Sequence, residues 1–72
     1  MPDRDPRTDP REGDELRERA GARLLLVDLV RDGWVYWRTV TDDGGLIAAW
    51  RAPLTEWREL APKECEAPHA AP

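Results

Sequence analysis

The chain has 72 residues with 15 acidic and 11 basic side chains, which give a net charge of −4, and a chain this short forms at most one domain. It contains no Ser, Asn, Gln or Phe, which excludes a serine nucleophile, a phosphoserine switch and an N-glycosylation site. Cys65 is the only cysteine and cannot form an intramolecular disulfide. The first residues lack the apolar segment of a signal peptide, and apolar runs such as residues 24–27 are too short to span a bilayer. We therefore expect a soluble protein of the cytoplasm with no membrane partner.

Both ends of the chain are poor in apolar side chains. Residues 1–12 place prolines every fourth position among charged side chains, with no apolar residue after Met1. Residues 62–72 contain three prolines and three alanines. Such segments bury too little apolar surface to offset the cost of ordering, so we expect a disordered N-terminal arm (1–12) and a disordered C-terminal tail (62–72).

Residues 13–61 hold every Trp, Leu, Ile and Val of the chain, and closely spaced turn signals divide them into short runs. The turn signals are Ala20-Gly21-Ala22, Arg31-Asp32-Gly33 and Asp42-Asp43-Gly44-Gly45. An Asp-Gly pair between hydrophobic runs is a strong hairpin signal, and the runs are rich in Val, Thr and aromatic residues. The sequence therefore predicts antiparallel strands at about residues 14–19, 23–30, 34–41 and 46–52, with Pro53 ending the fourth.

Two further segments have helical spacing. Leu54, Trp57 and Leu60 recur every three residues, which predicts a single helical turn that could lead into a short last strand. Residues 14–30 could instead form one helix, because their apolar side chains also match one helical face. Gly21 in the middle and the continuous apolar run at 24–27 argue against that helix, so we favour two strands.

Four or five short strands in residues 13–61 are too few for a sandwich, but they suffice for a small SH3-like antiparallel barrel. In this mostly β fold the helical turn precedes the last strand. A core of this size is near the lower limit for independent folding. Dimerisation through an exposed edge strand would add stability.

Several segments resemble those of small SH3-like barrel proteins, in particular short uncharacterised proteins of phages and prophages. They are Gly13-Asp14-x-Leu16-Arg17-x-Arg19-x-Gly21, Leu24-x-Leu26-x-Asp28-Leu29-Val30, Asp32-Gly33-x-Val35-x-Trp37-Arg38 and Leu54-x-x-Trp57-x-x-Leu60. The resemblance covers residues 13–61. It implies the barrel fold and a mobile-element setting, and it supplies no catalytic residue to transfer to this chain.

The aromatic residues are the main candidates for function. Alternation along the third strand places Trp34 and Tyr36 on one face with Arg38, while Trp37 points to the other face. Some of the aromatic rings must fill a core that has no Phe. Rings left outside could stack on nucleic acid, enclose a cationic side chain or form a protein-binding hot spot. We predict a partner-binding patch, whose members are Trp34, Tyr36, Arg38, Trp50 and Arg51.

Other polar residues give no catalytic or metal site. Cys65 and His69 are two ligands where a zinc site needs four, and a mobile tail cannot hold a Cys–His nucleophile pair. Most Asp pairs fall in predicted turns, where Asp is favoured for local hydrogen bonds. Asp28 interrupts an apolar run, and we expect it to be exposed or to pair with Arg38 or Arg51 on a neighbouring strand. We therefore predict no enzyme activity, metal or cofactor.

These observations predict a non-catalytic binding protein. With the resemblance, they indicate a phage or mobile-element protein that occludes a host protein complex in the host cytoplasm, for example an anti-CRISPR or another counter-defence inhibitor. The alternative is a small nucleic-acid-binding regulator that uses the same aromatic and arginine face. Residues 13–61 carry 9 acidic and 7 basic side chains, a balance that argues against nucleic acid.

Overall fold

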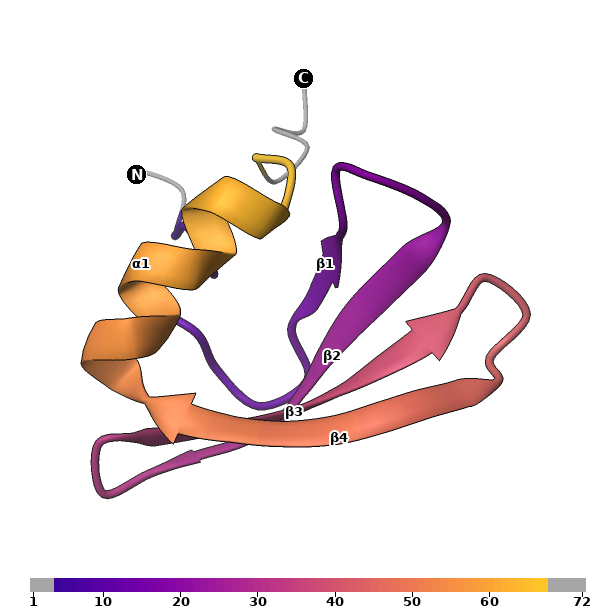
Figure 1. Cartoon of the computed structure of the whole chain (residues 1–72). Helices are drawn as coiled ribbons and strands as arrows, with labels where there is room; N and C mark the ends of the chain where they lie inside the picture. Colours follow the sequence, from indigo (N-terminus) through magenta and orange to yellow (C-terminus); the bar gives the residue numbers. More distant parts are fainter. Residues whose placement is uncertain (1–3, 68–72) are drawn as a thin grey trace.

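The computed structural model describes residues 4–67, which form an antiparallel sheet and one helix (Figure 1). The strands are β1 (Glu15–Arg17), β2 (Arg23–Arg31), β3 (Trp34–Thr41) and β4 (Leu46–Pro53), and α1 (Leu54–Glu64) follows them. The strands lie side by side in sequence order, β1-β2-β3-β4. Figure 1 shows α1 above one face of this curved sheet. No helix within residues 4–67 is long and apolar enough to cross a bilayer.

The four predicted strands are confirmed, and the alternative helix over residues 14–30 is wrong. Gly21, at a φ of 113°, lies in the connection between β1 and β2, where its conformation suits a turn and not a helix. The turn between β2 and β3 is the predicted Asp-Gly pair, with φ of 53° at Asp32 and 78° at Gly33. Positive φ at both central residues is the type I′ geometry that matches strand twist in a two-residue hairpin.

The helix is longer than the single turn predicted from the spacing of three. It has 11 residues because Trp57, Ala61 and Cys65, spaced by four, form an apolar stripe that continues past Pro62. All three residues are fully buried. The ring of Trp57 packs edge to face on that of Trp37, with 4.9 Å between their centroids. This contact joins the helix to the middle of the sheet.

The sheet is open, so the predicted closed barrel is not what these strands form. Among residues 4–67 no strand joins β4 to β1. The chain leaving α1 does turn back to β1, where Glu18 and Cys65 form an isolated bridge. Around it the Arg19 N–H donates to the Glu64 carbonyl (2.8 Å) and the Glu66 N–H donates to the Arg17 carbonyl (2.9 Å). A three-residue β1 offers too short an edge for a longer fifth strand.

The structure places the N-terminal arm, residues 4–12, against α1, whereas its composition predicts a disordered segment. The buried indole N–H of Trp57 donates to the Pro6 carbonyl (3.0 Å), and Arg58 Nε donates to the Thr8 carbonyl (2.8 Å). Arg4 forms a bidentate ion pair with Asp14, which follows the arm in the sequence. A buried indole needs an acceptor, and the arm supplies it.

The predicted tail, residues 62–72, begins inside the helix and not after the domain. Pro62 to Glu64 are helical and Cys65 is buried against β1. Residues 68–72 of the tail and residues 1–3 of the arm lie outside the described residues. The packed unit thus includes residues on both sides of the expected domain of residues 13–61, because Cys65, the last residue of the apolar stripe, and the acceptor for Trp57 lie in flanking segments.

Candidate partner-binding face

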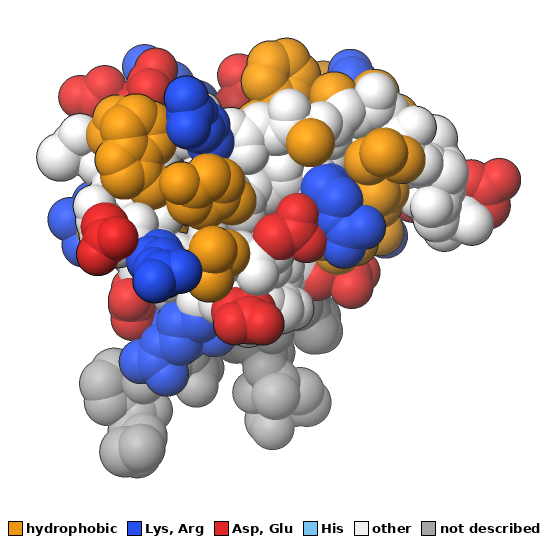
Figure 2. All heavy atoms as spheres, turned by 90° about the horizontal axis from the view of Figure 1, so that it is seen from below, with side chains coloured by type: hydrophobic (Ala, Val, Ile, Leu, Met, Phe, Trp, Pro, Cys, Tyr) orange, Lys and Arg blue, Asp and Glu red, His pale blue; other side chains and the backbone are white. Residues whose placement is uncertain are grey.

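The sheet has two faces of different character. Alternate residues of β3, namely Val35, Trp37 and Thr39, are buried beneath α1. Trp34, Tyr36 and Arg38 therefore point to the opposite face, which we call the outer face. Figure 2 views the molecule from below, and hydrophobic side chains gather there beside Lys or Arg side chains.

The strand register decides which other residues share the outer face with β3. Tyr36 is opposite Arg51 on β4 and opposite Leu29 on β2. Trp34 is opposite Pro53, and Arg38 is opposite Ala49. We define the outer patch as Tyr36 together with its neighbours on this face, two on β3 and the two residues opposite it: Leu29, Trp34, Tyr36, Arg38 and Arg51. Four of the five predicted partner-binding residues are thus brought together.

Trp34 and Arg51 contact each other within the outer patch. The Arg51 guanidinium carbon lies 5.4 Å from the centroid of the Trp34 ring, which is cation–π distance. Trp34 is 38% exposed, although its side chain is a large apolar group. Contact with Arg51 holds the ring in place while leaving part of it open to solvent. A pre-positioned aromatic ring loses little conformational entropy when a partner covers it.

Arg38 is held by an ion pair with Asp28, one of the alternatives that the sequence leaves open for this acid. Arg38 Nε lies 2.9 Å and 3.0 Å from the two carboxylate oxygens of Asp28. The register of β2 and β3 shifts between Val27 and Leu29, so Asp28 is the extra residue of a β-bulge. This explains why an acid interrupts the apolar run of β2.

Trp50, the fifth predicted residue, lies on the other face of the sheet. It is opposite Trp37, and its indole N–H donates to the Thr39 hydroxyl (3.1 Å). Trp50 is 55% exposed at the rim of a groove of about 310 Å³ between the sheet and α1. Adjacent residues of a strand point to opposite faces, so Trp50 and Arg51 cannot share one patch.

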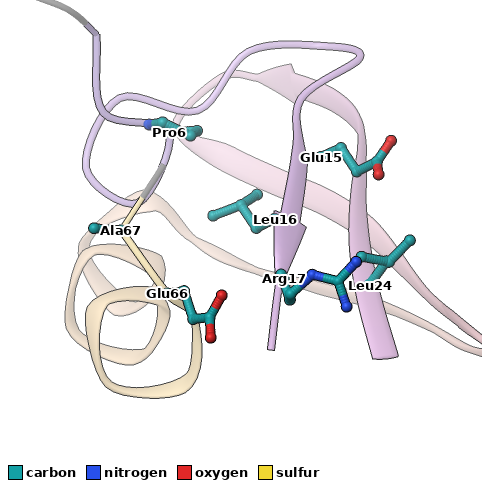
Figure 3. A pocket seen from close by; sticks show the side chains of 7 residues that line it. All are labelled: Pro6, Glu15, Leu16, Arg17, Leu24, Glu66 and Ala67. Atoms are coloured by element: carbon teal, nitrogen blue, oxygen red, sulfur yellow. The ribbon is translucent and has the colours of Figure 1, made fainter. Parts of the chain in front are cut away.

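A second hollow lies between β1 and the segment that follows α1 (Figure 3). It has a volume of about 190 Å³, and its lining includes Glu15, Arg17 and Glu66. Figure 3 shows Leu16 between the arm residue Pro6 and the side chains of β1 and β2. One Arg and two carboxylates give it a mixed polar wall. Residues 4–67 contain no group of three His, Cys, Asp or Glu side chains placed to hold a metal ion.

The thiol of Cys65 is suited to packing and not to nucleophilic chemistry. Burial, reinforced by the negative charges of Glu18 and Glu64, raises the pKa of Cys65 to about 11. The thiol therefore stays protonated near neutral pH, whereas a nucleophile or metal ligand must be a thiolate. His69, which the sequence pairs with Cys65, lies outside the described residues.

Sequence reasoning missed Leu29, Leu46 and Ile47, all exposed hydrophobic side chains. Leu29 joins the outer patch only because of the bulge at Asp28, which the intruding acid could have indicated. Leu46 and Ile47 lie on β4 within residues 44–50, and the absence of charged residues from this segment is visible in the sequence.

Comparison of the chain with known protein families, with curated proteins and with solved structures finds no match.

Proposed function

We propose that this protein is a non-catalytic binding module that attaches to a protein partner through the outer patch. The observation that carries the proposal is the exposed Trp34 ring with Arg51 stacked over it. Protein-binding hot spots are enriched in Trp, Tyr and Arg, and they combine apolar area with polar groups that orient the partner. The patch contains all three residue types, with Leu29 beside them.

The electrostatics favour a protein over a nucleic acid. Nucleic-acid binding requires several cations that face phosphates. In the outer patch, Arg38 is neutralised by Asp28 and Arg51 is engaged with Trp34. The whole chain carries a net charge of −4. Such a surface attracts partners through apolar burial and directed hydrogen bonds, with little help from charge.

The proposed mechanism is steric occlusion of a host protein complex. We propose that residues 13–61 belong with the phage and prophage proteins that their motifs resemble. On that basis the target is a host protein, and inhibition of a defence complex, as by an anti-CRISPR, is one form that the function would take. We also propose that the fold is a relative of SH3-like barrels. The four-stranded meander, and the bridge that brings Cys65 back to Glu18 of the first hairpin, support that assignment.

Affinity capture with matched variants tests the proposal. Ten of the eleven basic residues are Arg, whose codons are rich in G and C, so we infer a high-GC bacterium as host. Tagged protein is incubated with lysate of such a bacterium, with and without nuclease, and the recovered partner is purified for titration. We expect Trp34→Ala and Arg51→Ala each to weaken binding by about thirtyfold, the factor that corresponds to a hot-spot residue. Trp50→Ala, on the opposite face, and Arg11→Ala, an exposed arginine of the arm, are the controls and should bind normally.

Two outcomes would contradict the proposal. If the Trp50 control loses binding as strongly as Trp34→Ala, the outer patch is not the contact. If nuclease removes everything that is recovered, and affinity falls steeply with added salt, the alternative function of nucleic-acid binding is favoured. Circular dichroism of each variant separates lost binding from lost folding.

A further inference from the structure

The two edge strands of the sheet, β1 and β4, differ in whether another segment of the chain lies alongside them. The outer side of β1 is occupied by Glu64 to Glu66, which return from α1 and hydrogen-bond with Arg17 and Arg19. The outer side of β4 faces no other strand within residues 4–67. An uncovered edge presents backbone N–H and C=O groups that another strand can pair with.

The hairpin geometry identifies which residues of β4 present these groups. A two-residue turn is closed by a hydrogen-bonded pair, here Arg31 and Trp34, so the backbone groups of Trp34 point to β2. Alternate residues of β3 then point to β4, and their partners there are Ala52, Trp50 and Ala48. Ala49 and Arg51 consequently direct their N–H and C=O groups away from the sheet.

The side chains of β4 leave this edge without the usual protection. Edge strands are commonly guarded by charged residues, but residues 44–50 carry no charge. Leu46 is 65% exposed and Ile47 is 46% exposed, and Trp50 follows them. A partner strand that carried charges would have to desolvate them against these apolar groups. The strand that fits this edge is therefore mostly apolar, and β4 itself is such a strand, with Arg51 as its one charged residue.

We infer that β4 pairs antiparallel with β4 of a second copy of this chain, about a two-fold axis at Ala49. In this register Ala49 is opposite Ala49 of the second copy. The small Ala48 is opposite the second copy's Trp50, so the exposed indole ring can pack over it. Arg51 is opposite Ile47 of the second copy. A register centred on Arg51 would instead place two guanidinium groups opposite each other, which is unfavourable.

The two-fold axis is perpendicular to the sheet, so the dimer forms one continuous sheet with both outer patches on the same side. A single pair of strands buries less than the roughly 1,200–2,000 Å² of a standard stable interface. We therefore expect weak, reversible association, with a dissociation constant of about 1–100 µM. This inference concerns the β4 edge and does not depend on the function of the outer patch.

Analytical ultracentrifugation between about 1 and 500 µM, concentrations that bracket the expected constant, tests the inference. The wild-type chain should pass from monomer to dimer. Ala49→Lys, at an exposed position, places two ammonium groups opposite each other and should raise the dissociation constant at least about tenfold. Ala22→Lys, at an exposed position in the β1–β2 connection, adds the same charge and should leave association unchanged.

Mixing variants tests the register. Ala49→Glu alone should also dissociate, whereas an equimolar mixture of Ala49→Glu and Ala49→Lys should form a heterodimer, since opposite charges then meet at the axis. The inference is overturned if the wild type stays monomeric throughout, if Ala49→Lys dimerises as the wild type does, or if the mixture fails to associate. Growth beyond a dimer would also overturn it. Circular dichroism confirms that each variant keeps its fold.

Discussion

The contact between Trp57 and Pro6 gives the sharpest test of the fold. Trp57→Phe keeps an aromatic ring in the core but removes the indole N–H that donates to the Pro6 carbonyl. An acceptor left without a partner in a buried site costs about 1–3 kcal/mol. The smaller ring also leaves a cavity of about 40 Å³, worth about 1 kcal/mol at about 24 cal/mol per Å³.

The expected loss in the free energy of unfolding is therefore about 2–4 kcal/mol. A chain of this length has a total of roughly 4–11 kcal/mol, so the loss is a large fraction. Urea denaturation followed by far-UV circular dichroism measures it. Trp34→Phe makes the same chemical change at a partly exposed position and should cost less than about 1 kcal/mol.

Equal losses in these two variants would refute the docking of the arm. A double-mutant cycle sharpens the test, because deletion of residues 1–9 and Trp57→Phe remove the same hydrogen bond. The effect of the deletion should be smaller by about 1 kcal/mol in the Trp57→Phe variant than in the wild type. Strict additivity would instead support the disordered arm that the composition predicts.

Three further predictions concern single groups. The hydrogen-bonded ion pair with Arg4 lowers the pKa of Asp14 in the folded protein, so the free energy of unfolding should fall as the pH drops below about 4, and Asp14→Asn should flatten that dependence in urea titrations. The raised pKa of Cys65, about 11 against an ordinary 9.0, should slow alkylation by iodoacetamide at least about a hundredfold until urea unfolds the chain. Gly33→Ala should cost about 1 kcal/mol and lower Tm by about 4–8 °C, because a φ of 78° strains a side chain, and Gly33→Asn should cost less.

Local signals were enough to predict the sheet. The Asp-Gly turn and the β-branched runs beside it indicated the strands to within a few residues, but they left Arg38 as only one of two possible partners of Asp28. The docked arm could not be predicted in this way, since the Trp57–Pro6 bond joins residues 51 positions apart and no local pattern reports it. The length of the helix was underestimated because the prediction followed residues spaced by three and missed the buried residues spaced by four, which end at Cys65.

The candidate site was predictable in part for a similar reason. Alternation correctly grouped Trp34, Tyr36 and Arg38, because it depends on one strand alone. It also forbids Trp50 and Arg51 from sharing a face, but only the β3–β4 register decides that Arg51 is the outer one. That register depends on where both hairpins close.

Leu29 belongs to the outer patch because the alternation of inward and outward residues along β2 differs when it is counted from the two ends of the strand. Counted from the pairing with β1, Leu26 of β2 is outward and Val27 is buried. Counted back from the Asp-Gly turn, Leu29 is outward and Val30 packs against the core. Strict alternation cannot satisfy both counts, and one extra residue, Asp28, removes the mismatch as a bulge. Asp28 also accepts a hydrogen bond from Arg38. This one extra acidic residue therefore directs the Leu29 side chain to the outer face and holds the Arg38 side chain in place.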